Sequence, residues 1–223
     1  MARPMETSLE IHWPYLALAL ILLWFPRSWL RIGRWRRSRR RQRETMVKFQ
    51  QDGGARPDDK SVRLGRELRS PRNYVDFLRA LAGGLALWQF SFTAGAADGQ
   101  TVLLAKLLIT FAAILLQSVR WKSSRITFFA AVFFYAGISI GMGHYVSGTL
   151  AFLLTCAINP VLATPRLFVS AYAAALLPFN HFLGGTGLAL SAANSLMLFA
   201  PVLLSLLANR PMVIFMRKHE VMW

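Results

Sequence analysis

Seven long apolar segments, separated by short polar loops, restrict this chain to a small set of folds. A helix crosses the hydrocarbon core of a bilayer with about 20 mostly apolar residues, and most of these segments are close to that length. A soluble domain of this size could not cover so many apolar side chains. We therefore predict an all-α, polytopic membrane protein with about seven transmembrane helices, at residues 11–30, 71–93, 100–119, 126–142, 146–164, 167–183 and 188–208.

Capping and turn residues separate these segments. Ser70 followed by Pro71 has the form of a helix start, because serine caps the first turn and proline needs no N–H donor there. Asp98 and Gly99 predict a turn before the third segment, and the glycine-rich residues 184–187 predict one before the seventh. The pattern predicts one N-terminal helix followed by three helical hairpins.

An arginine-rich run follows the first apolar segment. Residues 31–43 contain eight arginines among thirteen residues, in a chain whose net charge is +16. Lysine and arginine in short loops mark the cytoplasmic side of membrane proteins. A cleaved secretory signal carries its positive charge before the apolar run, whereas here Glu6 and Glu10 precede it. We expect the first helix to be retained and the run to lie in the cytoplasm.

The remaining loops alternate in charge in the same way. The loops on the side of the arginine run hold nearly all of the basic residues, whereas the loops on the other side hold only Arg3 against Glu6, Glu10 and Asp98. This alternation predicts an N-terminus outside the cell and a cytoplasmic C-terminus. The predicted divisions of the chain are an N-terminal helix (1–30), a basic cytoplasmic linker (31–70), a six-helix membrane domain (71–208) and a basic tail (209–223).

The arginine run has three candidate partners. An anionic lipid surface attracts clustered arginines at about 1 kcal/mol per residue. Nucleic acid is an unlikely partner, because a single tryptophan interrupts the run and no nucleic-acid-binding module surrounds it. A membrane-protein partner stays open. The residues that we assign to the lipid and topology anchor are Arg34, Arg36, Arg37, Arg39, Arg40, Arg41 and Arg43.

Polar residues inside the predicted spans are candidates for function, because each is costly in hydrocarbon. Lys106 is the most expensive and needs a compensating partner such as Glu10, Asp98, a lipid phosphate or an anionic substrate. Several histidines and asparagines fall on the same outer half. They could form an outward-facing polar pocket, or they could simply make hydrogen bonds between helices. The residues of this candidate pocket are Lys106, His144, His181, Asn180 and Asn194.

The spacing of these residues fits no metal or haem motif, so we expect no metal and no cofactor. No paired carboxylates or nucleophile–base set appears in a span, which disfavours an enzyme. The small residues of GISIG (137–141) are suited to close helix contact. Two functions stay open: a non-enzymatic membrane subunit or scaffold that packs through such small-residue faces, and a small transporter with a site near Lys106. The arginine usage and short loops favour a bacterial inner membrane.

Overall fold

The structure is a computed structural model that describes residues 9–25, 64–93, 98–122, 125–142, 145–162 and 164–213. Within these residues the chain is mostly helical, as expected for an all-α fold, and a few short strands accompany the helices. The main helices are α1 (Trp13–Trp24), α4 (Pro71–Leu85), α5 (Gly99–Ser118), α6 (Val132–Met142), α7 (Tyr145–Ile158), α8 (Pro165–Phe182) and α9 (Leu188–Leu207). The minor elements are α3 (Leu64–Leu68), a π-helix η3 (Ala86–Phe90), a 3-10 turn η4 (Asn159–Val161) and the strands β1 (Glu10–Ile11), β2 (Phe92–Thr93), β3 (Val119–Lys122), β4 (Arg125–Phe129) and β5 (Met212–Val213).

Proline and its neighbours set several helix starts. Pro71 opens α4 after Ser70, at the position predicted from the sequence. Pro165 opens α8, where the Thr164 hydroxyl accepts a hydrogen bond from the Leu167 amide at 3.2 Å. The α4 helix passes directly into η3, so one helical segment runs from residue 71 to residue 90.

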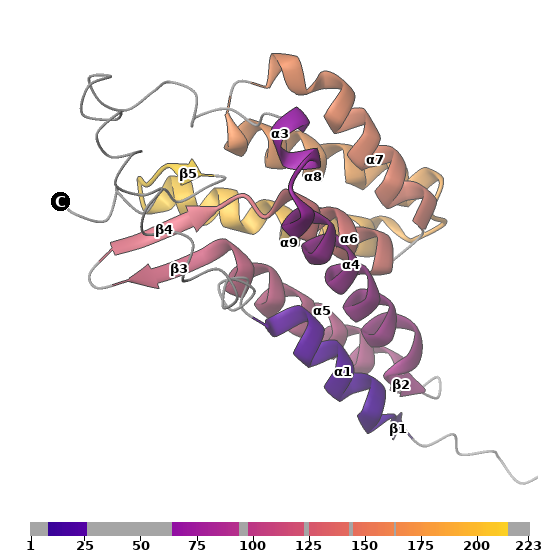
Figure 1. The fold of residues 1–223 in the computed structure, drawn as a ribbon. Helices are drawn as coiled ribbons and strands as arrows, with labels where there is room; N and C mark the ends of the chain where they lie inside the picture. Colours follow the sequence, from indigo (N-terminus) through magenta and orange to yellow (C-terminus); the bar gives the residue numbers. More distant parts are fainter. Residues whose placement is uncertain are drawn as a thin grey trace, which may run out of the picture.

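Two small sheets mark opposite ends of the helices (Figure 1). At one end β1 pairs antiparallel with β2, which joins the start of α1 to the end of η3. At the other end β3 and β4 form a hairpin after α5, and β5, which follows α9, pairs in parallel with β4. We call the end that contains β3, β4 and β5 the sheet end. The helices α1, α5 and α9 finish there, and α4 begins there.

The α6 helix occupies the centre of the fold, and almost all of its side chains are buried. It packs against α4 on one side and α7 on the other. Its two glycines face the α4 backbone: a Cβ atom on Gly137 would lie 2.3 Å from the carbonyl oxygen of Phe77, and one on Gly141 would lie 2.8 Å from that of Leu81. The close contact expected of GISIG is therefore present, and it lies within the chain itself.

Two adjacent glycines on α4, Gly83 and Gly84, contact two different helices, α1 and α6. A Cβ atom on Gly83 would lie 2.8 Å from Cγ of Leu23 in α1, whereas one on Gly84 would lie 3.2 Å from the Cα atom of Gly141 in α6. Successive positions on a helix point about 100° apart, so this pair lets two helices approach one segment of α4. The α4 helix is thus held between α1 and α6.

The predicted helix at 126–142 differs from the structure. Its first residues form the strand β4, and residues 130–131 continue without helical structure before α6 begins at Val132. The strand is stabilised by pairing with β3 before it and with β5 from the far end of the chain. Among the described residues, α5 and α9 are the helices long and apolar enough to cross a membrane by length and composition.

An apolar core lies between the helices, and it also encloses charged and amide side chains. Sixteen polar or charged residues in the described part of the chain are buried, among them Asp76, Gln117 and Asn194. Large apolar side chains are exposed along the same helices. On α5 and α9 the exposed leucines include Leu104, Leu108, Leu116, Leu196, Leu203, Leu206 and Leu207.

Candidate functional site

Lys106, the most costly residue predicted from the sequence, lies on α5 and contacts the end of the neighbouring α4–η3 segment. Its Nζ donates a hydrogen bond to the carbonyl oxygen of Trp88 at 2.8 Å. The same ammonium group lies 5.9 Å from the centre of the Trp88 ring and 5.8 Å from that of Phe92. Cation–π contacts of this kind add about 0.5–2 kcal/mol. These groups stabilise the ammonium group, and its hydrogen bond is to a carbonyl group and not to Glu10 or Asp98.

Asn180 and His181 lie at the end of α8, beside the turn to α9, and Asn194 lies in the second turn of α9. The Thr186 hydroxyl donates to the Asn180 carbonyl at 2.8 Å, and the His181 ring lies 3.4 Å from the Thr186 carbonyl. The side-chain oxygen of Asn194 is buried, and no donor within the described part of the chain reaches it. Asn180 and His181 thus contact one turn, and His144 falls outside the described residues.

The described residues of the predicted pocket have different hydrogen-bond partners. The contacts of Lys106 are with η3 and β2, whereas Asn180 and His181 contact the α8–α9 turn. None of the hydrogen bonds between described residues joins Lys106 to Asn180, His181 or Asn194. The arginine anchor at Arg34, Arg36, Arg37, Arg39, Arg40, Arg41 and Arg43 lies outside the residues that the structure describes.

A second polar cluster, nearer the sheet end, was not predicted from the sequence. Arg79 of α4 forms an ion pair with Asp76 at 3.0 Å and donates a hydrogen bond to Gln117 of α5 at 2.9 Å. Arg79 also donates to the carbonyl oxygen of Phe25, at the end of α1. Gln117 donates to the carbonyl oxygens of Leu23 and Phe25 at 3.1 and 3.0 Å. We call the side chains of Arg79 and Gln117, with these two carbonyl groups, the α1 clasp.

The α1 clasp provides partners both for the last carbonyl groups of α1 and for the buried guanidinium of Arg79. The last carbonyl groups of a helix have no partner within that helix and carry partial negative charge. A buried guanidinium needs acceptors for its five N–H donors. Arg79 and Gln117 are both buried, and their acceptors include the C-terminal carbonyl groups of α1. The clasp therefore joins α1, α4 and α5 at a single point.

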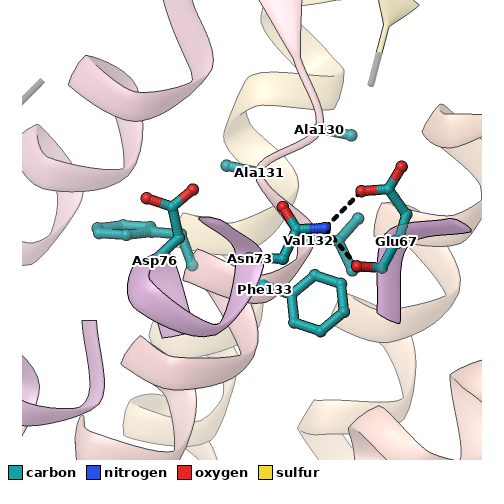
Figure 2. A pocket seen from close by; sticks show the side chains of 8 residues that line it. Glu67, Asn73, Asp76, Ala130, Ala131, Val132 and Phe133 are labelled. Atoms are coloured by element: carbon teal, nitrogen blue, oxygen red, sulfur yellow. Dashed lines mark hydrogen bonds between the residues drawn. The ribbon is translucent and has the colours of Figure 1, made fainter. Parts of the chain in front are cut away.

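A short polar contact lies beside the start of α6 (Figure 2). The Asn73 amide donates to the Glu67 carboxylate at 2.6 Å and to the Glu67 carbonyl at 2.9 Å, which ties α3 to α4. Both residues, with Asp76 and residues 130–134, line a cavity of about 10 Å³. This volume holds about one water molecule. In this conformation the cavity is too small for an organic substrate.

Arg166 of α8 binds the end of α9 in the way that Arg79 binds the end of α1. Its Nε donates to the Ser205 hydroxyl at 3.0 Å, and its Nη2 donates to the Ser205 carbonyl at 3.1 Å and to the Arg210 carbonyl. Ser205 lies in the last turn of α9. Three cations, Arg79, Lys106 and Arg166, thus bind carbonyl groups at or beyond the end of a neighbouring helical segment. The arrangement stabilises contacts between helices, and it presents no set of reacting groups.

One sequence signal could have revealed the α1 clasp. Asp76 and Arg79 are an acid and a base three residues apart within a predicted span, which places them on one helix face. The α1 carbonyl groups that accept from Arg79 and Gln117 have no such signal, because a backbone carbonyl group is present at every residue.

Comparison of the chain with protein-family models, with curated proteins and with solved structures found no match.

Proposed function

We propose that this chain is a multi-pass membrane protein with about seven spans, an outside N-terminus and a cytoplasmic C-terminus. We further propose that it acts as a non-enzymatic membrane subunit or scaffold in a bacterial inner membrane. The observation that carries this proposal is the exposure of large apolar side chains along helices whose buried sides hold charged and amide groups beside the apolar core. Burial of a leucine side chain contributes about 1.5–3 kcal/mol relative to exposure in water, so many exposed leucines are unfavourable there and favourable in lipid.

The burial of α5 and α9 distinguishes two explanations of their apolar sequences. The core helix of a soluble protein is buried over most of its surface. Here only 22% of the apolar stretch of α5 and 44% of that of α9 are buried within the protein. Each of these helices has 20 residues, or about 30 Å at 1.5 Å per residue, which equals the thickness of the hydrocarbon core.

The distribution of side chains on α4 also supports the proposed membrane location. Asn73, Asp76 and Arg79 are buried, whereas Tyr74 and Leu78 are exposed. A surface helix of a soluble protein has the reverse arrangement. Polar side chains directed toward the interior and apolar ones directed outward are expected where lipid is the solvent.

The two ends of the bundle support the proposed orientation. At the sheet end, basic residues occur before α4, in the β3–β4 hairpin, at the start of α8 and after α9. At the opposite end, residues 9–12, 91–93, 98 and 183–187 include no lysine or arginine. Aromatic residues are enriched at membrane interfaces. The opposite end exposes the aromatic side chains of Trp13 (68%), Tyr145 (72%) and Phe182 (78%).

The role of a subunit or scaffold is supported by how the described polar groups are used. Arg79, Lys106, Gln117 and Arg166 all bind helix ends or neighbouring side chains, which is a structural use. The GISIG face, which could have received a partner, is already occupied by α4. A membrane partner would instead meet the exposed leucine faces of α5 and α9. Anionic lipids are the proposed partner of the arginine anchor.

Membrane fractionation tests the membrane proposal. The tagged chain should remain in the membrane pellet after extraction at alkaline pH and should enter solution only with detergent. Recovery of the folded chain from the soluble fraction would contradict the proposal.

Photo-crosslinking tests the scaffold proposal. A photoreactive residue at Leu108 or Leu196 should form a protein adduct of defined mass in native membranes. The same residue at the buried Leu198 should form no such adduct, because this side chain is 2% exposed. Lipid adducts alone at both exposed positions would count against a partner on these faces.

A further inference from the structure

The α4 helix is poorly suited to enter a bilayer by itself. It carries Arg72, Asp76 and Arg79 within three turns, and it is not among the described helices that meet the length and composition criteria for a span. Charged residues at the centre of a span strongly disfavour its insertion. A segment of this kind needs contacts from neighbouring helices to stay at membrane depth.

The α1 helix supplies such contacts at two adjacent places. Through the α1 clasp, its last carbonyl groups bind Arg79 directly and Gln117 beside it. One turn further along α4, Gly83 leaves space for the side chain of Leu23, which is fully buried. The apolar contact at Gly83 therefore positions the Phe25 carbonyl group that accepts a hydrogen bond from Arg79.

We propose that docked α1 holds α4 in the membrane because its carbonyl groups accept hydrogen bonds from Arg79 and Gln117, beside the ion pair of Arg79 with Asp76. This inference rests on the proposed membrane location and goes beyond it, because it assigns α1 a defined task in the assembly of the domain. The first helix is then a permanent part of the bundle. The orientation of the α4–α5 hairpin depends on it, although the two are separated by the whole basic linker.

The substitution Gly83→Leu tests the proposal because hydropathy and docking predict opposite results. Leucine makes α4 more apolar, which by itself favours insertion. Its side chain also occupies the space of Leu23 and displaces α1, which leaves Arg79 without the Phe25 carbonyl. If α1 docking is required, Gly83→Leu reduces correct insertion of α4. If hydropathy alone decides, it has no effect or increases insertion.

The position of the α4–α5 loop is measured in the full chain with a single cysteine, Asp98→Cys, in a Cys156→Ala background. A membrane-impermeant maleimide labels this cysteine in intact cells only when the loop lies outside. We expect Gly83→Leu to lower labelling about tenfold, which corresponds to about 1.4 kcal/mol. The added pair Asp76→Asn and Arg79→Leu should restore labelling, because the guanidinium that binds the Phe25 carbonyl is then absent from α4. Gly187→Leu is the matched control, since a Cβ atom there meets no atom within 4 Å.

Each outcome decides between the proposals. Labelling of Gly83→Leu at the unaltered level would overturn the role of α1 while the membrane location stands. Low labelling that the charge-removing pair does not restore would also overturn it, because the loss would then come from disturbed packing. Recovery of the unaltered chain in the soluble fraction would instead overturn the proposed membrane location.

Discussion

Lys106 on α5 donates a hydrogen bond to the backbone carbonyl of Trp88, at 2.8 Å, where the α4–η3 segment ends. Arg79 binds the end of α1 in the same manner, and Arg166 binds the end of α9. In each case a cation on one helix meets the negative end of a neighbouring helix dipole. The cations and the helix-end carbonyl groups thereby compensate each other between helices, and Arg79 has the Asp76 carboxylate as a further partner.

The Lys106–Trp88 contact predicts the effect of Lys106→Met. Methionine fills a similar volume but leaves the Trp88 carbonyl without this donor, at a cost of about 1–3 kcal/mol. We expect a lower midpoint of thermal unfolding in detergent than for the unaltered chain. Lys106→Arg, which retains the charge and the donors, should lose less. Equal stability of the unaltered chain and Lys106→Met would mean that the ammonium group is available for another purpose, such as the transport of an anion.

The centre of the fold predicts a strong effect of Gly137→Ala. The added methyl group would lie 2.3 Å from the carbonyl oxygen of Phe77, and this backbone atom cannot move without separating α4 from α6. We expect a loss of about 3 kcal/mol or more in the free energy of unfolding. Gly99→Ala is the control, because a Cβ atom there meets no atom within 4 Å. Denaturation in mixed detergent micelles measures both, and similar values for the two variants would show that the α4–α6 contact is looser than described.

The α1 clasp predicts that glutamine is required at position 117 and not at position 89. Gln117→Leu removes one acceptor for Arg79 and two hydrogen bonds to α1, so we expect a loss of about 1–3 kcal/mol. Gln89→Leu makes the same chemical change at an exposed position of η3 and should change stability by about 0.5 kcal/mol or less. Comparing the two variants by thermal unfolding isolates the clasp from the general effect of a more apolar side chain. If both variants lost the same stability, the α1 clasp would not contribute to the stability of the fold.

The arginine run predicts the orientation of α1. Replacing Arg36, Arg37, Arg39, Arg40 and Arg41 by glutamine removes most of the charge that follows this helix. We expect a larger share of chains with the N-terminus in the cytoplasm, measured by protease access to an N-terminal tag in intact cells. As a control, Arg166→Gln alone should leave the share of chains with a cytoplasmic N-terminus unchanged. Unaltered orientation of the five-residue variant would assign the run to another task.

The sequence predicted the long helices well because their boundaries are local. The segments predicted at 100–119 and 188–208 correspond to α5 at Gly99–Ser118 and α9 at Leu188–Leu207. A turn containing Asp98 or Gly187 precedes each, and a continuous apolar run follows. Such signals lie within a few residues of the feature that they predict.

Features that depend on distant parts of the chain were missed. The strand β4 was predicted as helix because its residues are apolar, and its pairing with β5 joins positions more than eighty residues apart. Arg79 was not selected as a site because its acceptor, the Phe25 carbonyl, lies 54 positions earlier. The candidate pocket at Lys106, His144, His181, Asn180 and Asn194 stays a prediction. The depth of a residue in a span gives no information on which neighbour it faces.

Cysteine labelling at the two ends of the bundle tests the central claim most directly. Tyr145→Cys and Asn209→Cys place single thiols, in a Cys156→Ala background, at exposed positions on opposite ends. The account predicts that an impermeant maleimide labels the thiol at position 145 in intact cells and labels the one at position 209 only after the membrane is permeabilised. Labelling of both thiols in intact cells, or of position 209 alone, would contradict the proposed membrane protein with an outside N-terminus and a cytoplasmic C-terminus.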